Sequence, residues 1–463
     1  MSDYQLIVIG AGPGGTAAAL KAASLGISTA LVEKRDVGGT CLNRGCVPTK
    51  TLLHVSEIFY EAENGASSGI RIDGARMDTE ALFAYKREIC DKLRSSSESQ
   101  LKSAGVTVLK GTASVTDAHT VRVVSCTDDA TVLLSADSIL LASGSVPARP
   151  PIPGLNLPGV VTSDELLEGM DPLPDSILIM GGGVIGAEFA QFFSDLGVET
   201  SVIEGLDRLL PNMDRDLGQN LALILKKQGV KIFTGAMISR IETDGEHLKA
   251  VFSSKNGEAS CSAETVLCAI GRTPYLKGIF PEDLKPEMDG RRIKVDQDFA
   301  TSIPGIYAIG DVSSKIQLAH AASAQGAAFA EKRYGTSGGV RMDIVPGCVY
   351  CRPEIATVGL TEADAKEAGI SVKIGKCVMF SNARTLISGD GRSFMKILAE
   401  SESRRIVGAQ LMCRNSSDMI GEISQAIAGG MTPDQLLMAM RPHPTFEEAM
   451  TDALEDLKKK LNS

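Results

Sequence analysis

The strongest constraint on the fold of this chain is a strand–turn–helix–strand–acid unit that occurs twice. The first copy begins with the apolar, β-branched segment Tyr4–Ile9, passes through the glycine turn Gly10–Gly15 and reaches an acid at Glu33. The second copy has its glycine turn at Gly181–Gly186 and its acid at Glu204. In each copy 23 positions separate the first glycine from the acid, and the copies lie 171 residues apart. This order is typical of dinucleotide-binding units, so the sequence predicts two such sites.

The glycines of the first turn have distinct physical roles. Gly10 permits a tight turn, Gly12 lets the backbone approach a pyrophosphate, and Gly15 lets the helix pack against the strand. The pyrophosphate would lie at the amino end of the next helix, where backbone N–H groups lack partners. The elements expected around both turns are helices at Thr16–Leu25 and Ala187–Leu196 and strands at Ser28–Val32, Ser176–Met180 and Thr200–Ile203.

The two acids indicate what each unit binds. Glu33 can accept hydrogen bonds from ribose hydroxyl groups. Glu204 can do the same in the second unit, and its charge would repel a 2′-phosphate. The nearest arginine that follows Glu204 is Arg208, four positions on. The second site should therefore prefer NAD over NADP.

Length and composition restrict the class of protein. A chain of 463 residues should form about three domains, and 43% hydrophobic residues with 47 glycines favour a folded α/β protein. The net charge of −10 disfavours nucleic acid and anionic membranes as partners. The amino-terminal segment does not resemble a secretory signal, and we find no apolar run of membrane-spanning length. We therefore expect a cytoplasmic location.

Two cysteines follow the first unit closely, in the segment GGTCLNRGCVPTK at residues 38–50. Cys41 and Cys46 are five positions apart, so on one regular helix they would point to different faces. A bond between them needs a distorted turn, which Gly45 and Pro48 permit. Taken alone, this spacing fits two unrelated buried thiols. Beside two dinucleotide units, in a reducing compartment, it favours a redox pair.

Several further motifs make the resemblance to a known family plain. The chain resembles the pyridine nucleotide–disulfide oxidoreductases over nearly its whole length, and most of all their dihydrolipoamide dehydrogenase branch. Besides the two glycine turns and the cysteine segment, the resemblance rests on AIGRTP at residues 269–274, GIYAIGD at 305–311, LAH at 318–320 and HPTFEE at 443–448.

The resemblance implies FAD in the first site and NAD in the second. It implies that Glu33 holds the adenosine ribose of FAD, that Asp311 holds its ribityl chain, and that Lys50 pairs with Glu188 beside the flavin. The residues expected to bind FAD or NAD are Gly10, Gly12, Gly14, Gly15, Glu33, Lys34, Thr40, Lys50, Gly111, Thr112, Ala113, Ser143, Gly144, Gly181, Gly183, Ile185, Gly186, Glu188, Glu204, Gly271, Arg272, Gly310, Asp311, Leu318, Ala319 and His320.

The resemblance also assigns the catalytic groups. It makes Cys41 the thiol that meets the substrate and Cys46 the thiol beside the flavin. Thiol exchange needs a base, and His443, held between two prolines with Glu448 five positions on, fits that role. The family places this histidine opposite Cys41 of a second subunit, which implies a homodimer with shared active sites. One departure is Arg441, where these dehydrogenases commonly have a histidine; it could narrow the substrate channel or favour an anionic disulfide.

The expected architecture is α/β, with two Rossmann-like dinucleotide domains and a carboxyl-terminal α/β dimerisation domain. The expected boundaries are 1–146 for the FAD domain, 147–273 for the NAD domain, 274–342 for a segment that completes the FAD site, and 343–463 for the dimerisation domain. We expect no metal site, because the pair Cys348 and Cys351 has no second pair nearby, and residues i and i+3 of a strand face opposite sides. Those two cysteines should be structural.

The predicted reaction is oxidation of protein-bound dihydrolipoyl groups, with electrons passing through a redox disulfide and FAD to NAD. Two alternatives stay open. One is an NADH-dependent reductase of another small disulfide, such as glutathione or coenzyme A disulfide. The other is a flavin-containing redox sensor without catalytic activity.

Overall fold

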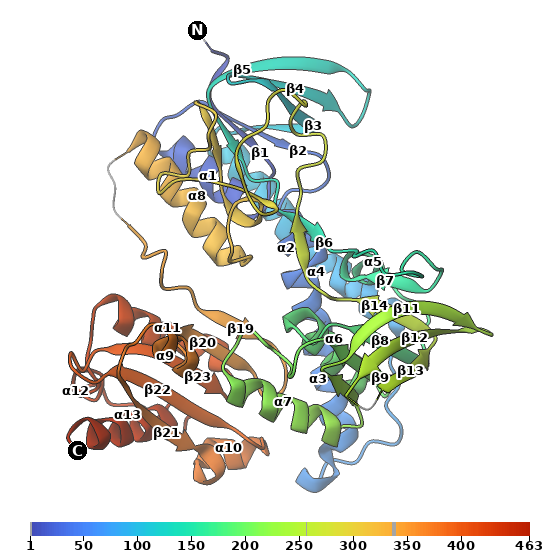
Figure 1. Cartoon of the computed structure of the whole chain (residues 1–463), viewed down its shortest axis with the longest axis vertical. Helices are drawn as coiled ribbons and strands as arrows, with labels where there is room; N and C mark the ends of the chain where they lie inside the picture. Colours follow the sequence, from blue (N-terminus) through green and yellow to red (C-terminus); the bar gives the residue numbers. More distant parts are fainter. Residues whose placement is uncertain (1, 256, 336–338) are drawn as a thin grey trace.

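The computed structural model describes residues 2–255, 257–335 and 339–463, which form three lobes (Figure 1). The upper lobe contains the first glycine turn, the lower right lobe contains the second, and the lower left lobe is the carboxyl-terminal part of the chain. Each lobe is built on its own sheet. This architecture confirms the predicted fold class.

The first sheet carries the first glycine turn at the carboxyl end of its central strand β1. Strand β1 pairs in parallel with both β2 and β5, and β5 pairs in parallel with β18. Its last four residues are buried, as expected for a parallel strand covered on both faces. The elements are β1 (Tyr4–Ile9), β2 (Thr29–Glu33), β3 (Thr107–Asp117), β4 (Thr120–Ser125), β5 (Thr131–Leu141) and β18 (Ile306–Ala308), with helices α1 (Pro13–Ser24) and α8 (Ala319–Tyr334).

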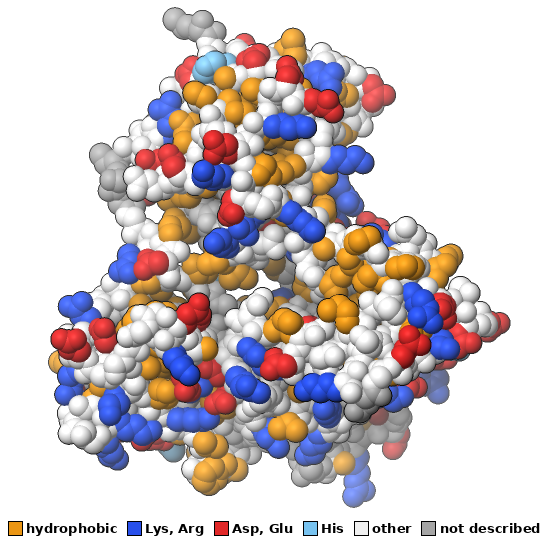
Figure 2. All heavy atoms as spheres, viewed as in Figure 1, with side chains coloured by type: hydrophobic (Ala, Val, Ile, Leu, Met, Phe, Trp, Pro, Cys, Tyr) orange, Lys and Arg blue, Asp and Glu red, His pale blue; other side chains and the backbone are white. Residues whose placement is uncertain are grey.

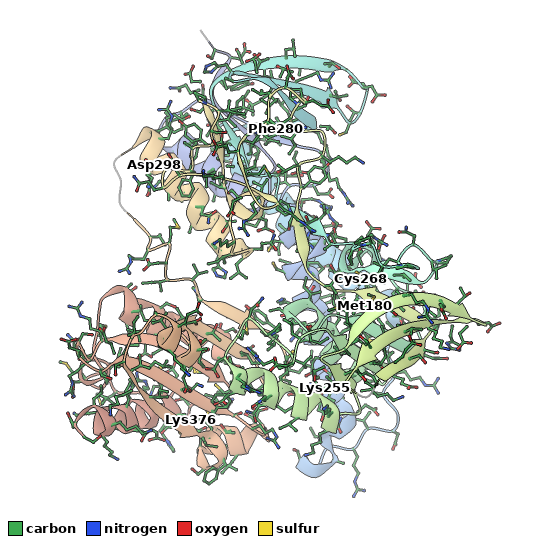
Figure 3. All side chains as sticks on the ribbon, viewed as in Figure 1. Met180, Lys255, Cys268, Phe280, Asp298 and Lys376 are labelled. Atoms are coloured by element: carbon green, nitrogen blue, oxygen red, sulfur yellow. The ribbon has the colours of Figure 1, made fainter. Side chains whose placement is uncertain are left out.

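The second sheet repeats this arrangement around the second glycine turn. Strand β8 pairs in parallel with β9 and β14, and Met180 lies opposite Cys268 at the carboxyl ends of β8 and β14 (Figure 3). The elements are β7 (Val160–Thr162), β8 (Ser176–Met180), β9 (Glu199–Glu204), β10 (Lys231–Thr234) and β14 (Thr265–Cys268), with α5 (Ser163–Glu168), α6 (Val184–Asp195), α7 (Arg215–Lys227) and the antiparallel sheet β11 (Met237–Asp244), β12 (His247–Ser254) and β13 (Gly257–Ala263).

The third sheet is antiparallel and is covered by two long helices. Its strands are β19 (Gly347–Val349), β20 (Ile355–Gly359), β21 (Val372–Val378), β22 (Phe394–Glu400) and β23 (Ile406–Met412). The helices of this lobe are α9 (Glu362–Glu367), α10 (Ala383–Ser388), α11 (Ser416–Ala428), α12 (Pro433–Leu436) and α13 (Glu448–Leu461), with the 3-10 turn η3 (Met379–Ser381).

The remaining elements connect the lobes. The cysteine segment forms α2 (Gly39–Arg44) and the start of α3 (Cys46–Asn64), and the long helix α4 (Thr79–Ser103) packs against α3. Strands β6 (Ser145–Pro147) and β15 (Arg272–Pro274) form a two-stranded ribbon between the first two sheets. Three short elements complete the chain: η1 (Gly65–Ser68), η2 (Gly310–Val312) and the β16–β17 hairpin (Met288–Asp289 and Arg292–Ile293).

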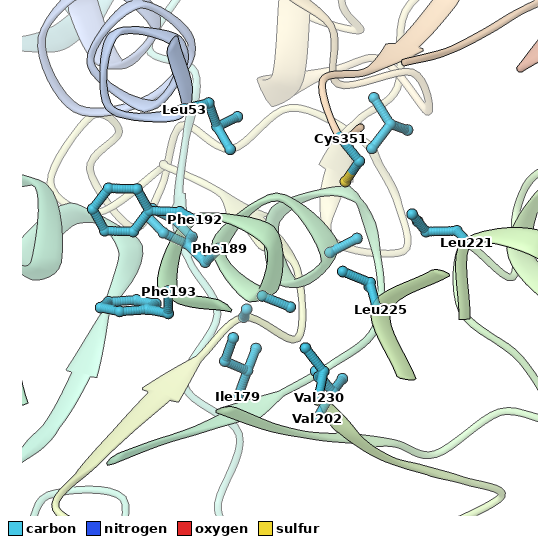
Figure 4. Packing of buried hydrophobic residues seen from close by; sticks show 14 of the residues in the cluster. Leu53, Ile179, Phe189, Phe192, Phe193, Val202, Leu221, Leu225, Val230 and Cys351 are labelled. Atoms are coloured by element: carbon cyan, nitrogen blue, oxygen red, sulfur yellow. The ribbon is translucent and has the colours of Figure 1, made fainter. Parts of the chain in front are cut away.

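The main core runs from the second lobe into the third. Phe189, Phe192 and Phe193 of α6 pack among Ile179 and Val202, and Cys351 from the carboxyl-terminal lobe lies in the same cluster (Figure 4). Burial of such aromatic side chains stabilises a fold strongly, by roughly 1.5–3 kcal/mol each. The second and third lobes therefore share one apolar core.

Ion pairs reinforce the contact between these two lobes. Lys396, whose side chain is 3% exposed, donates to both carboxylate oxygens of Asp214 at 2.9 Å. Lys376, labelled in Figure 3, pairs with Asp216 on α7 at 2.9 Å. Both acids lie at the amino end of α7, where negative side chains are favourable.

The structure corrects the ends of several predicted elements. Helix α1 begins at Pro13 and α6 at Val184, each three residues before the predicted start, because each helix begins directly at the glycine turn. Proline suits the first turn of a helix, where its missing N–H costs little. Strand β18 pairs with β5, so the segment expected to complete the FAD site returns to the first sheet.

Candidate active site

The two cysteines lie on either side of a break between two helices. Helix α2 ends at Arg44, Gly45 takes the dihedral angles φ −150° and ψ −110°, and α3 begins at Cys46. This break is the distortion that the spacing of Cys41 and Cys46 requires. All ten cysteines, this pair among them, are free thiols in the structure.

Two glycines place the thiol helix against the first glycine turn. Gly38 and Gly39 both have positive φ, at 93° and 57°. A Cβ on Gly39 would lie 2.7 Å from the Cα of Gly12, so only glycine allows this close approach. The redox pair is thereby held beside the site predicted for FAD.

The two thiols have opposite electrostatic environments. The pKa of Cys46 is lowered to about 7, first because the Cys41 thiol donates a hydrogen bond to it and also because Lys50 lies one helical turn further along α3. The same hydrogen bond and burial raise the pKa of Cys41. Cys46 is therefore the thiol that carries the negative charge.

Lys50 forms the ion pair that the resemblance implied. Its Nζ lies 2.9 and 2.7 Å from the two carboxylate oxygens of Glu188, a side chain that is 3% exposed. Glu188 also accepts the backbone N–H of Tyr350 at 3.0 Å, and the Tyr350 ring covers Lys50 Nζ at 4.7 Å. Tyr350 comes from the carboxyl-terminal lobe, so the connecting helix α3, the second lobe and the carboxyl-terminal lobe meet at this point.

The acids of the two repeated units make the same contacts. Glu33 accepts the N–H groups of Ala11 and Arg35, each at 2.8 Å. Glu204 accepts those of Gly182 and Leu206, at 2.6 and 2.7 Å. Each carboxylate thus holds its own glycine turn, and each is 8% exposed. The equivalence extends from the sequence spacing to individual hydrogen bonds.

The glycine turns leave room for two dinucleotides. A Cβ built on Gly12 or on Gly183 would have no described atom within 4 Å, so the backbone is open at the start of both helices. In contrast, a Cβ on Gly15 would lie 1.9 Å from the carbonyl oxygen of Gly10, and one on Gly186 would lie 1.9 Å from that of Gly181. The residues present therefore fit the pyrophosphates of FAD and NAD.

One large cavity connects the two glycine turns with the thiols. Its volume is about 1510 Å³, above the roughly 300–1,000 Å³ of a pocket for one ligand. Figure 2 shows the surface hollowed at the junction of the three lobes. Cys41, Cys46 and every predicted cofactor-binding residue except Gly15 and Gly186 line this cavity. Those two glycines lie beneath it, where they allow helix and strand to pack closely.

Asp311 is held by a serine that the sequence did not single out. Ser145 Oγ donates to Asp311 Oδ2 at 2.6 Å and accepts from Arg272 Nε at 2.8 Å. Ser145 is 7% exposed and lines the cavity. His320 also lines the cavity, and its Nε2 lies 2.8 Å from the carbonyl oxygen of Pro346.

The predicted base lies away from this cavity. His443 Nδ1 is 2.8 Å from Glu448 Oε1, and the histidine side chain is 72% exposed. The N–H of Thr445 donates to the other oxygen of Glu448, and both contacts lower the pKa of that carboxyl. Neither His443 nor Glu448, both among the described residues, lines the cavity that contains Cys41. The structure forms the His443–Glu448 pair without bringing it to the thiols of the same chain.

Arg441 does not have the free guanidinium that a role in the substrate channel would need. Its side chain is 5% exposed and forms an ion pair with Glu422. It also donates to Thr451 Oγ1 at 3.2 Å and contacts the sulfur of Met450 at 3.6 Å. Through these contacts Arg441 joins α11 to α13, whereas the sequence left open whether it narrows a substrate channel or favours an anionic disulfide.

Only Cys348 of the second cysteine pair lies on a strand, because β19 ends at Val349, and Cys348 also lines the cavity. Cys351 lies in the core shared by the second and third lobes, and Cys348 packs against the core on the other side of the third sheet. Burial raises the pKa of Cys348 to about 11. The two side chains therefore do not converge.

The family model described as pyridine nucleotide-disulphide oxidoreductase matches residues 4–326 of the chain. The model of the dimerisation domain of the same family matches residues 345–454. The chain belongs to this family. Membership confirms the predicted reaction class and its cofactors, FAD and NAD.

Relatives and solved structures in the family cover nearly the whole chain. The dihydrolipoyl dehydrogenase of Bacillus subtilis is 35% identical over 98% of this chain and 97% of its own length. The dihydrolipoamide dehydrogenase of Chaetomium thermophilum is 35% identical over 98% of this chain and 90% of its own length. Among structures, LpdA of Mycobacterium tuberculosis has a TM-score of 0.89 with 26% identity, covering 97% of this chain and 99% of LpdA. The flavoprotein disulfide reductase RclA of Escherichia coli has a TM-score of 0.87 with 28% identity, and the match covers 98% of this chain and 99% of RclA.

Sequence reasoning missed three residues at this oxidoreductase site. Tyr350 covers Lys50, Ser145 holds Asp311, and Asp164 lies 3.4 Å from Arg272. Each is far along the chain from the residue it contacts. Only Ser145 had a signal in the sequence, because it directly follows the predicted residues Ser143 and Gly144.

In the part of the chain that is described, no helix is both long and apolar enough to span a membrane.

Proposed function

We propose that this oxidoreductase is a dihydrolipoyl dehydrogenase that acts as a cytoplasmic homodimer. It oxidises a protein-bound dihydrolipoyl group to the cyclic disulfide and reduces NAD. The observation that carries the proposal is the Cys46 thiol, which has a pKa of about 7 beside the Lys50–Glu188 pair, in a cavity shared by both glycine turns. The relatives named above support the choice of substrate.

The proposed chemistry begins with the oxidised form of the cysteine pair. His443 of one subunit takes the proton from a substrate thiol, and the resulting thiolate attacks Cys41 Sγ of the other subunit. The Cys41–Cys46 bond breaks, Cys46 leaves as thiolate, and a mixed disulfide joins Cys41 to the substrate. The second substrate thiol then attacks the substrate sulfur of that bond. Cys41 leaves with the proton that His443 held, the proton of the second substrate thiol passes to the freed imidazole, and the substrate departs as a disulfide.

After this exchange Cys41 is a thiol and Cys46 is a thiolate. Lys50 stabilises the negative charge that remains on Cys46. Glu448 orients the His443 ring through their hydrogen bond. When bound, FAD supplies two-electron transfer from the dithiol to NAD.

The exposed surface of the carboxyl-terminal lobe supports a homodimer. His443 is exposed and lies outside the cavity of its own chain, so it is available to a second subunit. Large apolar side chains of the same lobe are also exposed: Val378, Phe380, Leu386, Ile387, Met438 and Met440. Apolar surface of this kind is typical of protein interfaces. The match to a dimerisation domain agrees with this arrangement.

A comparison of substrates tests the proposal. The FAD-loaded protein is assayed anaerobically with dihydrolipoamide and NAD, and in reverse with NADH and lipoamide, glutathione disulfide or coenzyme A disulfide. We expect dihydrolipoamide and lipoamide to give the highest kcat/KM. Faster turnover of another disulfide would favour a different reductase, and the absence of turnover with every substrate would favour the redox sensor.

The second site is expected to discriminate between NAD and NADP by at least about 100-fold in kcat/KM, because like charges at close range cost several kcal/mol. Glu204 would face the 2′-phosphate, and Arg208 is occupied by Asp207 and by the carbonyl of Pro211 at 2.9 Å each. Glu204→Gln should reduce the preference for NAD by raising the kcat/KM for NADP. Steady-state kinetics with both nucleotides measures this, and equal use of both by the unaltered protein would refute the assignment.

Cys46 is expected to titrate near neutral pH in the reduced, FAD-free protein. With a pKa of about 7, its thiolate dominates above that pH and is lost below it, whereas an ordinary thiol has a pKa of about 8.5. The rate of alkylation at Cys46, followed by mass spectrometry, should therefore reach half its maximum near pH 7. Lys50→Met should move this midpoint to higher pH. A midpoint at the ordinary value in both proteins would contradict the role of Lys50.

A further inference from the structure

The ribbon between the first two sheets lies directly beside Asp311. Strand β6 follows β5 out of the first sheet, and β15 follows β14 out of the second. The two strands pair antiparallel, with Ser145 opposite Pro274 and Arg272 opposite Pro147. The chain therefore crosses between the two nucleotide-binding lobes twice at the same place.

Side chains of this ribbon form a hydrogen-bonded chain with one possible direction. The guanidinium group of Arg272 can donate hydrogen bonds but cannot accept them. It donates from Nε to Ser145 Oγ at 2.8 Å and from a terminal nitrogen to the Ser145 carbonyl oxygen at 2.9 Å. Because the Ser145 hydroxyl oxygen accepts from the guanidinium, its single hydrogen is directed to Asp311 Oδ2, 2.6 Å away. The order of donation is thus arginine to serine to aspartate.

The far end of Arg272 is anchored in the second lobe. Another of its nitrogens lies 3.4 Å from Asp164 on α5, and Asp164 also lies 3.8 Å from Arg44 beside the redox cysteines. The side chains of Arg272 and Asp164 are 14% and 20% exposed, so solvent competes little with these contacts. Arg272 therefore has a fixed position from which it orients the Ser145 hydroxyl.

We propose that Ser145 is a positioning residue that sets the Asp311 carboxylate for bound FAD, with Arg272 as the fixed donor behind it. The proposal rests on the proposed function, because FAD is the group that Asp311 would hold. A carboxylate that already has its orientation loses less conformational freedom when it binds a hydroxyl group. Arg272 then acts through Ser145, although it lines the cavity and was expected to contact a cofactor.

Binding of FAD to the apoprotein tests this role. Ser145→Ala should weaken FAD binding about tenfold, since a hydrogen bond to a charged group is lost. Ser145→Thr keeps the hydroxyl and should retain the affinity of the unaltered protein. The matched control is Ser138→Ala on β5, because Ser138 is 0% exposed and accepts a hydrogen bond from Arg333 at 3.2 Å, outside the cavity. It should change FAD affinity by less than about twofold.

A double-mutant cycle shows whether Ser145 acts through Asp311. In an Asp311→Asn background the hydrogen bond is neutral and about half as strong, so Ser145→Ala should cost about threefold instead of tenfold. A full tenfold loss in that background, or no loss in the single variant, would overturn the inference. Thermal unfolding of the apoprotein shows whether Ser145→Ala folds. If it does not, Ser145→Cys takes its place, because a thiol has nearly the same shape and is a weak hydrogen-bond donor. This variant should also weaken FAD binding.

The outcomes separate this inference from the proposed function. If the unaltered protein does not bind FAD, the proposed function fails. If it binds FAD and Ser145→Ala binds equally well, the inference on Ser145 alone fails. FAD affinity is measured by quenching of flavin fluorescence, so the result does not depend on turnover.

Discussion

Cys41→Ser is expected to lower the kcat for dihydrolipoamide-dependent NAD reduction by at least about 10⁴-fold, the order of loss seen when a catalytic nucleophile is removed. A serine oxygen cannot form the mixed disulfide, so electrons from the substrate do not reach Cys46. The helix break at Gly45 and the Lys50–Glu188 pair do not depend on this sulfur. FAD content and NAD affinity should therefore be unchanged, which separates a chemical defect from misfolding.

The matched control for this variant is Cys377→Ser. Cys377 lies on β21, contacts Asp452 at 3.7 Å and is not among the cavity-lining residues. Its activity should stay within about twofold of the unaltered protein. If Cys41→Ser retains more than about a tenth of the activity, the redox pair does not take part in the reaction.

His443→Gln is expected to lower kcat by about 10²–10⁴-fold, the usual contribution of a general acid–base group. Glutamine retains a hydrogen bond to Glu448 but cannot carry the proton. The pH profile should lose the limb that reports this base. Glu448→Gln should have a smaller effect, since the imidazole remains and loses only its orienting partner. Both variants are measured by steady-state kinetics with dihydrolipoamide from pH 5 to about 9.

A mixture of inactive subunits tests whether His443 acts across the dimer. Cys41→Ser and His443→Gln chains, refolded or co-expressed together, form heterodimers in which one of the two sites has both groups intact. Random assortment should restore about a quarter of the original activity. If verified heterodimers are as inactive as either parent, the base does not come from the partner subunit.

The local rules in the sequence predicted the site well where spacing alone decides geometry. The 23-residue spacing from Gly10 to Glu33 gave the first dinucleotide unit, and the structure repeats the same carboxylate-to-turn hydrogen bonds in the second. Gly45 marked the break that a five-residue cysteine spacing needs. These features depend on backbone conformations that few residue types allow.

The sequence was less informative where contacts come from distant segments. Tyr350 reaches Lys50 from 300 positions away because the third sheet packs against α6, and the local pattern around Cys348 and Cys351 gave no sign of it. Arg441 was interpreted from its place near His443, yet the packing of α11 turns it toward Glu422. Side-chain direction at a lobe boundary depends on tertiary packing that the linear pattern does not contain.

The most direct test of the central claim is to follow the bond between Cys41 and Cys46 while electrons pass through the protein. Peptides that contain residues 41 and 46 are analysed by mass spectrometry after rapid quenching and alkylation. We predict a disulfide in the resting enzyme, two alkylated thiols after one equivalent of dihydrolipoamide without NAD, and the disulfide again after NAD is added. If NADH forms while this pair keeps a constant mass, electrons take another path and the account is wrong.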